Sequence, residues 1–127
     1  MTQKLSQTQR WTISRLAYWH LDRGRLAEAE ALARGLIALD NRDGMGWLYY
    51  GEARRQQGDL DGAVQGFEQA LRWMPDRADL WLRLGKLFIR LGRLEEARRA
   101  LEKARATADD GKLLRRVEAL LNRSTGR

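Results

Sequence analysis

Apolar side chains recur every three or four residues along most of the chain, in stretches that end at glycine, proline or clusters of aspartate and asparagine. Apolar residues with this spacing lie on one face of an α-helix, whereas glycine and proline favour its end. The pattern predicts a first helix from Ser6 or Thr8 to about Arg23. Further helices are predicted near residues 26–39, 45–57, 60–74, 78–91, 94–107 and 112–122.

Turn and cap residues separate these helices. Pro75 lacks a backbone N–H and cannot continue a helix, so it ends the fourth one. Asp109 or Asp110 is placed to cap the last helix, because a carboxylate accepts hydrogen bonds from the open N–H groups of a first turn. Residues 1–7 and 123–127 are polar and are expected to be loose.

Small and aromatic residues also recur at a fixed interval of 34 positions. The matching pairs are Trp47 and Trp81, Gly51 and Gly85, Gly58 and Gly92, Ala63 and Ala97, Phe67 and Leu101, and Ala70 and Ala104. Shifting backwards by the same interval places Gly24, Ala29 and Ala17 in phase. A constant period of this length indicates stacked copies of one helix–turn–helix unit.

The order of these residues, ending at Pro75, closely resembles the tetratricopeptide repeat (TPR). The resemblance implies an all-α, right-handed TPR superhelix of three helix–turn–helix repeats plus a C-terminal capping helix. It places the repeats at about 10–43, 44–77 and 78–109 and the capping helix at about 110–122, within a single domain spanning 1–127. Gly51 and Gly85 would let the two helices of a repeat approach closely.

The composition does not favour catalysis. The chain of 127 residues has no cysteine and one histidine, His20. Disulfides, thiolate metal sites, cysteine nucleophiles and multi-histidine metal sites are therefore excluded. No serine lies in a nucleophile-elbow context, and no glycine-rich phosphate loop precedes a lysine. The sequence thus predicts a protein that is not an enzyme and has no catalytic residue, metal or cofactor. It also has no apolar run long enough for a signal sequence or membrane span, so a cytoplasmic location is the default expectation.

In TPR proteins the first helix of each repeat lines a concave groove, and the resemblance implies a protein or peptide partner held there. Aromatic and aliphatic groove residues would anchor apolar side chains, and cations in the third repeat would meet an acidic segment or a C-terminal carboxylate. The predicted partner-binding residues are Trp11, Tyr18, Met45, Leu48, Tyr49, Glu52, Leu82, Arg83, Lys86 and Arg90. The register assigns Trp47 and Trp81 to the core.

The size, repeat architecture and apolar groove resemble those of the small TPR chaperones of bacterial type III secretion. That resemblance implies an adaptor or chaperone that covers an aggregation-prone segment of its client. A second familiar TPR function, gripping the acidic tails of heat-shock chaperones with a carboxylate clamp, is not favoured. Among the clamp positions only Arg83 agrees, and Asp79 would repel the carboxylate.

Two alternatives remain at this stage. The formal net charge is +7, and residues 64–127 carry most of the excess. A basic face could bind nucleic acid, although glutamates lie among these cations and weaken that prediction. Alternatively, an exposed apolar face could close a homodimer of a TPR scaffold.

Overall fold

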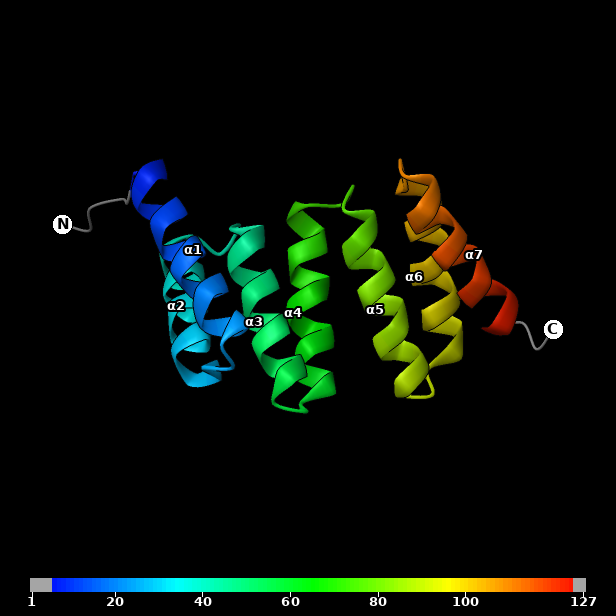
Figure 1. Ribbon diagram of the computed structural model, residues 1–127, viewed down its shortest axis with the longest axis horizontal. Helices are drawn as coiled ribbons and strands as arrows, with labels where there is room; N and C mark the ends of the chain where they lie inside the picture. The colour runs from blue at the N-terminus through cyan, green and yellow to red at the C-terminus, as the bar shows by residue number, and fades with distance from the viewer. Residues whose placement is uncertain (1–5, 125–127) are drawn as a thin grey trace. The chain divides into compact units, whose positions relative to one another are not determined.

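The protein is all α-helical in the computed structural model, which describes residues 6–124 (Figure 1). The helices are α1 (Gln7–Asp22), α2 (Leu26–Leu39), α3 (Gly44–Gln56), α4 (Leu60–Trp73), α5 (Ala78–Arg90), α6 (Leu94–Thr107) and α7 (Gly111–Ser124). They form three helix pairs, α1–α2, α3–α4 and α5–α6, followed by α7, as the repeat predicts. That residues 1–127 form a single domain stays a prediction.

The ends of the first and last helices follow from local side-chain chemistry. Ser6 Oγ accepts a hydrogen bond from the Gln9 backbone N–H at 3.1 Å, and the Gln9 side chain accepts one from Ser6 N–H at 2.9 Å. This reciprocal capping box starts α1. Asp110 Oδ1 accepts from the Lys112 N–H at 3.0 Å at the start of α7. Ser6 caps α1, Gln7 begins it, and the last helix runs through Ser124, so the expectation that residues 6, 7, 123 and 124 are loose is wrong. The expectation for residues 1–5 and 125–127 falls outside the described residues.

The turn within each repeat uses the same backbone conformation. Gly24, Gly58 and Gly92 have φ values of 71°, 86° and 75°. Side chains disfavour this left-handed region, and glycine enters it without a steric penalty. The backbone N–H after each of these glycines donates to a carbonyl of the preceding helix, as Arg25 does to His20 at 2.8 Å. The periodic glycines are therefore required by the turn.

The chain divides into two compact units, the first ending at Trp73 and the second beginning at Met74. In the first unit, α1 packs on α2, α2 on α3 and α3 on α4, and α1 also packs on α3. Its core combines small and large apolar side chains. The fully buried residues of this unit include Ala17, Ala29, Ala33, Leu36, Ala53, Ala63, Phe67 and Ala70.

Glycines bring α3 and α4 into close contact. A Cβ added to Gly51 would lie 2.7 Å from Phe67 Cδ1, so this glycine makes room for the aromatic ring, as predicted. A Cβ added to Gly66 would lie 2.6 Å from the Cα of Gly51. Real Cβ atoms do not approach other atoms that closely, so the two helices meet through backbone at Gly51 and Gly66.

The second unit holds α5, α6 and α7. Its core cluster contains Leu82, Leu101, Ala104, Val117 and Leu121, with Trp81, Ile89, Leu113 and Leu120 packed against it. Val117 and Leu121 bring the apolar stripe of α7 onto α6, which is the covering role predicted for the capping helix. Gly85 repeats the arrangement of Gly51, since a Cβ there would lie 2.7 Å from Leu101 Cδ2.

Candidate functional site

The most exposed aromatic surface lies on α1. Trp11 and Tyr18 expose 61% and 63% of their surface, and both were predicted to bind a partner. They lie seven positions apart, with Arg15 between them, so the three side chains share one helix face. The Arg15 guanidinium stacks over the Trp11 ring at 5.0 Å from its centroid. Large rings with an adjacent arginine form the kind of surface that dominates binding energy in protein interfaces.

The predicted binding residues of α3 are less accessible. Leu48 and Tyr49 expose only 9% and 7% of their surface, and Met45 is half-buried. Glu52 accepts two hydrogen bonds from the Arg55 guanidinium, at 2.6 and 2.9 Å. Leu48 and Tyr49 thus belong to the core, and the Glu52 carboxylate is already held by an arginine of its own helix. Their predicted contact with a partner stays a prediction.

The predicted residues of α5 fall into two groups. Leu82 is 3% exposed and belongs to the core cluster of the second unit. Arg83, Lys86 and Arg90 are exposed and follow one side of the helix. Leu82 thus holds α5 against α6 and α7, while the three cations face solvent.

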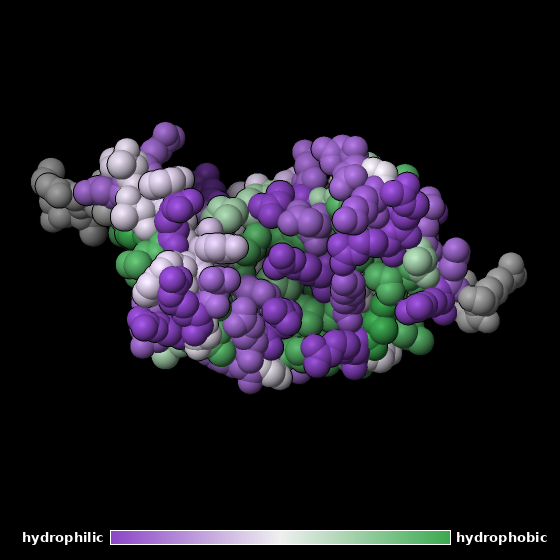
Figure 2. Space-filling model, viewed as in Figure 1, coloured by the Kyte–Doolittle hydropathy of each residue, from purple (hydrophilic) through white to green (hydrophobic). Residues whose placement is uncertain are grey.

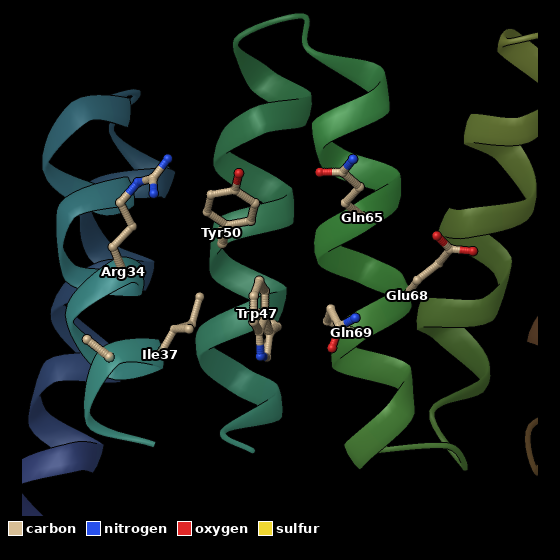
Figure 3. Close-up of a pocket in the computed structure, with 8 residues that line it drawn as sticks. Arg34, Ile37, Trp47, Tyr50, Gln65, Glu68 and Gln69 are labelled. Atoms are coloured by element: carbon tan, nitrogen blue, oxygen red, sulfur yellow. The ribbon is translucent and has the colours of Figure 1, made fainter. Parts of the chain in front are cut away.

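A hollow of about 670 Å³ lies between α2, α3 and α4, on residues that the groove prediction did not include. Figure 3 shows Trp47 and Tyr50 from α3 between Arg34 and Ile37 of α2 and the glutamines of α4. The lining residues are Arg34, Ile37, Ala38, Trp47, Tyr50, Gln65, Glu68 and Gln69. Such an aromatic floor with a polar rim can hold an apolar side chain.

Trp47 differs from its predicted place in the core. Its ring is half-buried, lines the hollow and meets the Tyr50 ring edge to face at 6.0 Å between centroids. Its Nε1–H donates to the Asn41 carbonyl at 2.8 Å. Trp81 makes the corresponding bond to the Pro75 carbonyl at 2.8 Å and packs against the core of its unit, as predicted. The repeat tryptophan therefore fastens the preceding turn in both repeats.

An ion-pair network beside the hollow joins α2 to α3. The Glu30 carboxylate accepts from Arg34 Nε at 2.9 Å, from Arg54 Nη2 at 3.2 Å and from Gln57 Nε2 at 3.4 Å. The hydrogen bond from Arg34 contributes most to lowering the pKa of Glu30 below its ordinary value, and the Arg54 charge adds to it. Both guanidiniums also stack near the Tyr50 ring, at 5.2 and 5.3 Å from its centroid.

We expect Glu30→Gln to destabilise the protein by about 1.5 kcal/mol at neutral pH, since hydrogen bonds to a charged group contribute more than neutral ones. Because the pKa of Glu30 is lowered by folding, its contribution is present above pH 4.5 and is lost as the pH falls below that value. Urea unfolding at pH 7 and at successively lower pH measures both effects.

Glu28→Gln is the matched control, because Glu28 is exposed on the same helix. It should change the free energy of unfolding by less than about 0.5 kcal/mol. Equal losses in the two variants at pH 7, or a Glu30→Gln loss that persists in acid, would show that the network does not stabilise the fold.

The described residues were also compared with the requirements of a metal site and of a membrane-spanning helix. No group of three or more histidine, aspartate or glutamate side chains is arranged to hold a metal ion within residues 6–124. Over the same residues, every helix is too short or too polar to cross a bilayer.

Family models for the tetratricopeptide repeat match residues 54–121 and, separately, residues 15–72. The chain belongs to the tetratricopeptide repeat family. A search of curated protein sequences found no match. The prediction of a TPR protein is therefore confirmed, and the bounds of its repeats stay a prediction.

Solved structures share this TPR fold over nearly the whole chain. PcrH of Pseudomonas aeruginosa, in complex with the chaperone binding region of PopD, is 23% identical, with a TM-score of 0.89 covering 100% of this chain and 98% of that chain. The Yersinia enterocolitica type III secretion chaperone SycD, in complex with a peptide of the translocator YopD, is 20% identical, with a TM-score of 0.87 and coverage of 97% of both chains. The first TPR of Spaghetti (RPAP3), bound to an HSP90 peptide, is 14% identical, with a TM-score of 0.77 covering 95% and 99% of the two chains. These similarities confirm the predicted all-α TPR fold.

Proposed function

We propose that this TPR protein is a non-catalytic chaperone or adaptor that binds a segment of a partner protein through the exposed aromatic face of α1. The observation that carries the proposal is the exposure of Trp11 and Tyr18, about three-fifths of each side chain, on one helix face. Aromatic rings gathered on one exposed face mark interaction surfaces, because burying rings of this size is strongly favourable. The half-buried Met45 would extend the contact onto α3.

The similar solved structures support a proposal about the class of partner. PcrH is described in a complex with the chaperone binding region of PopD, SycD in a complex with a peptide of the translocator YopD, and the RPAP3 domain in a complex with an HSP90 peptide. By analogy with the first two, we propose a type III secretion client bound in the cytoplasm before export. The shared fold supports the class of client that we propose. The exposed aromatic face of α1 supports the more general proposal that the protein binds a partner.

Self-association is the second candidate, because Leu16 and Trp19 are also exposed on α1. Such side chains could meet their copies across a two-fold axis. Trp19 is already covered in part by arginines, with Arg23 stacked at 4.0 Å and Arg25 at 5.1 Å from its ring centroid. Trp11 and Tyr18 are the better candidates for the contact, because they are more exposed than Trp19, which exposes 38% of its surface.

The proposal is tested by capturing partners from the native cytosol with the wild type and with a Trp11→Ser/Tyr18→Ser variant. We expect one protein to be retained by the wild type and its affinity to fall about 100-fold in the variant, since each buried aromatic anchor is a typical hot spot. Trp73→Ser is the control, because Trp73 is an exposed aromatic residue on α4. It should retain the partner.

The α1 variant should unfold at nearly the wild-type urea concentration, because about three-fifths of the surface of each replaced side chain is exposed. Charged substitutions at Leu48 or Tyr49 are unsuitable for this test, as they would place a charge in the core. Equal retention of the partner by the α1 variant would contradict binding through this face.

A further inference from the structure

Three cations follow one side of α5. Arg83, Lys86 and Arg90 are spaced by three and then four positions, which places them on a single helix face. All three are exposed. In Figure 2 a column of hydrophilic side chains runs over α5, beside hydrophobic side chains between α5 and α7.

Arg116 of α7 joins this group across the helix contact. Val117, which follows Arg116, shares the core cluster with Leu82, which lies one turn before Lys86. Partial desolvation lowers the pKa of Lys86, and the charges of Arg116 and Arg83 lower it further, as expected for neighbouring cations. Neither Lys86 nor Arg116 forms an ion pair with a carboxylate in the part of the chain that the structure describes. Asp79, one turn before Arg83, is already held by two hydrogen bonds from Arg77, at 3.0 and 2.9 Å.

Aliphatic side chains accompany the two central cations. Ile89 follows Lys86 by three positions and Leu120 follows Arg116 by four, so each lies one helical turn beyond its cation. Both are partly buried and pack against the core cluster of the unit. Clustered like charges raise the free energy of the folded protein unless an anion binds, and the adjacent apolar surface can cover an aliphatic group.

We propose that Lys86 and Arg116, with Arg83 beside them, bind the carboxylates of an acidic protein segment whose aliphatic side chains contact Ile89 and Leu120. This inference rests on the proposed peptide-binding function and names a second contact on the client. Charge complementarity favours an anionic ligand. The aliphatic neighbours favour a protein segment, whose aliphatic side chains can pack on them, over the sugar–phosphate backbone of a nucleic acid, which carries none.

The arginines of α6 also argue for a short acidic segment. Arg93 donates to Glu96 at 2.7 and 2.6 Å, and Arg98 donates to Glu95 at 2.9 Å and to Glu102 at 3.2 Å. These pairs neutralise part of the positive charge of the second unit. A nucleic acid would instead require a continuous basic track along its backbone.

The test measures binding of a fluorescent, end-blocked synthetic peptide of alternating leucine and glutamate pairs to the full chain. A second peptide carries glutamine in place of glutamate, and a single-stranded DNA oligonucleotide is the third probe. The test variant is Lys86→Gln/Arg116→Gln. Its control is Lys103→Gln/Arg105→Gln, which removes the same charge from exposed positions of α6.

We expect the glutamate peptide to bind the wild type and the control alike, and to bind the test variant at least about tenfold more weakly, because charge-assisted hydrogen bonds are lost. Lys86→Gln alone should raise the midpoint of thermal unfolding, since it relieves repulsion that no anion compensates. A rise in this midpoint would distinguish a role of Lys86 in binding from a role in stabilising the fold.

Three results would overturn the inference: no binding of the glutamate peptide to the wild type, equal binding of the glutamine peptide, or equal losses in both double variants. Tighter binding of DNA that depends on Lys86 and Arg116 would assign the site to phosphate instead. A native client that needs Trp11 and Tyr18 but not Lys86 and Arg116 would leave the proposed function intact and refute this second contact.

Discussion

Replacing Gly66 by alanine should destabilise the protein by about 3 kcal/mol, at the upper end of what overpacking costs. The added Cβ would lie 2.6 Å from the Cα and 2.7 Å from the backbone N of Gly51. Both contacts are to backbone of α3, which cannot rotate away as a side chain can. The two helices must therefore separate, which loosens the packing around Phe67. The free energy of unfolding in urea measures the loss.

Gly35→Ala is the control for this prediction. Gly35 is an exposed residue inside α2, and a Cβ there would meet nothing within 4 Å. Alanine should stabilise this helix by about 0.5–1 kcal/mol, because glycine loses more backbone entropy on folding. A loss at Gly66 no larger than the change at Gly35 would show that α3 and α4 do not meet through backbone.

The Phe67→Ala variant should lose about 4 kcal/mol, because Phe67 is fully buried and its removal leaves a cavity. The ring also explains why position 51 is glycine, since its Cδ1 and Cε1 atoms lie 2.7 and 2.8 Å from the site of an added Cβ. The two positions should therefore be coupled. Gly51→Ala should cost about 2 kcal/mol in the wild type and much less in the Phe67→Ala protein, where the clash is gone.

Urea unfolding of the wild type, the two single variants and the double variant completes the thermodynamic cycle. A coupling free energy of at least about 1 kcal/mol is expected for groups in direct contact. Additive losses would mean that Gly51 is required for some reason other than the Phe67 ring.

The sequence predicted the helices and the repeat closely because both depend on local chemistry. Gly24, Gly58 and Gly92 had to be glycine for the turns, so they recur in phase. Gly66 could not be recognised in the same way. Its counterparts one repeat away are Leu32 and Ala100, so the close contact of α3 with α4 is particular to this repeat and carries no periodic signal.

The binding residues were less predictable because exposure depends on packing between helices. Tyr18 and Tyr49 both lie on predicted groove positions, yet the first is exposed and the second buried. The register identifies a helix face but not whether a neighbouring helix covers it. The same limit explains Trp47, whose half-buried ring depends on the spacing of α2 and α4 around it. The grouping of Arg116 with Lys86 could not be predicted from the sequence, because the two residues lie on different helices.

The central claim, that the aromatic face of α1 binds a protein client, is tested most directly by photo-cross-linking in the native cytosol. A benzophenone amino acid replaces Tyr18, and in a control it replaces Glu28, an exposed residue of α2. The account predicts that position 18 cross-links to one segment of one partner protein and that position 28 does not. Cross-links from position 18 only to nucleic acid or to a second copy of this chain, or none at all, would contradict it.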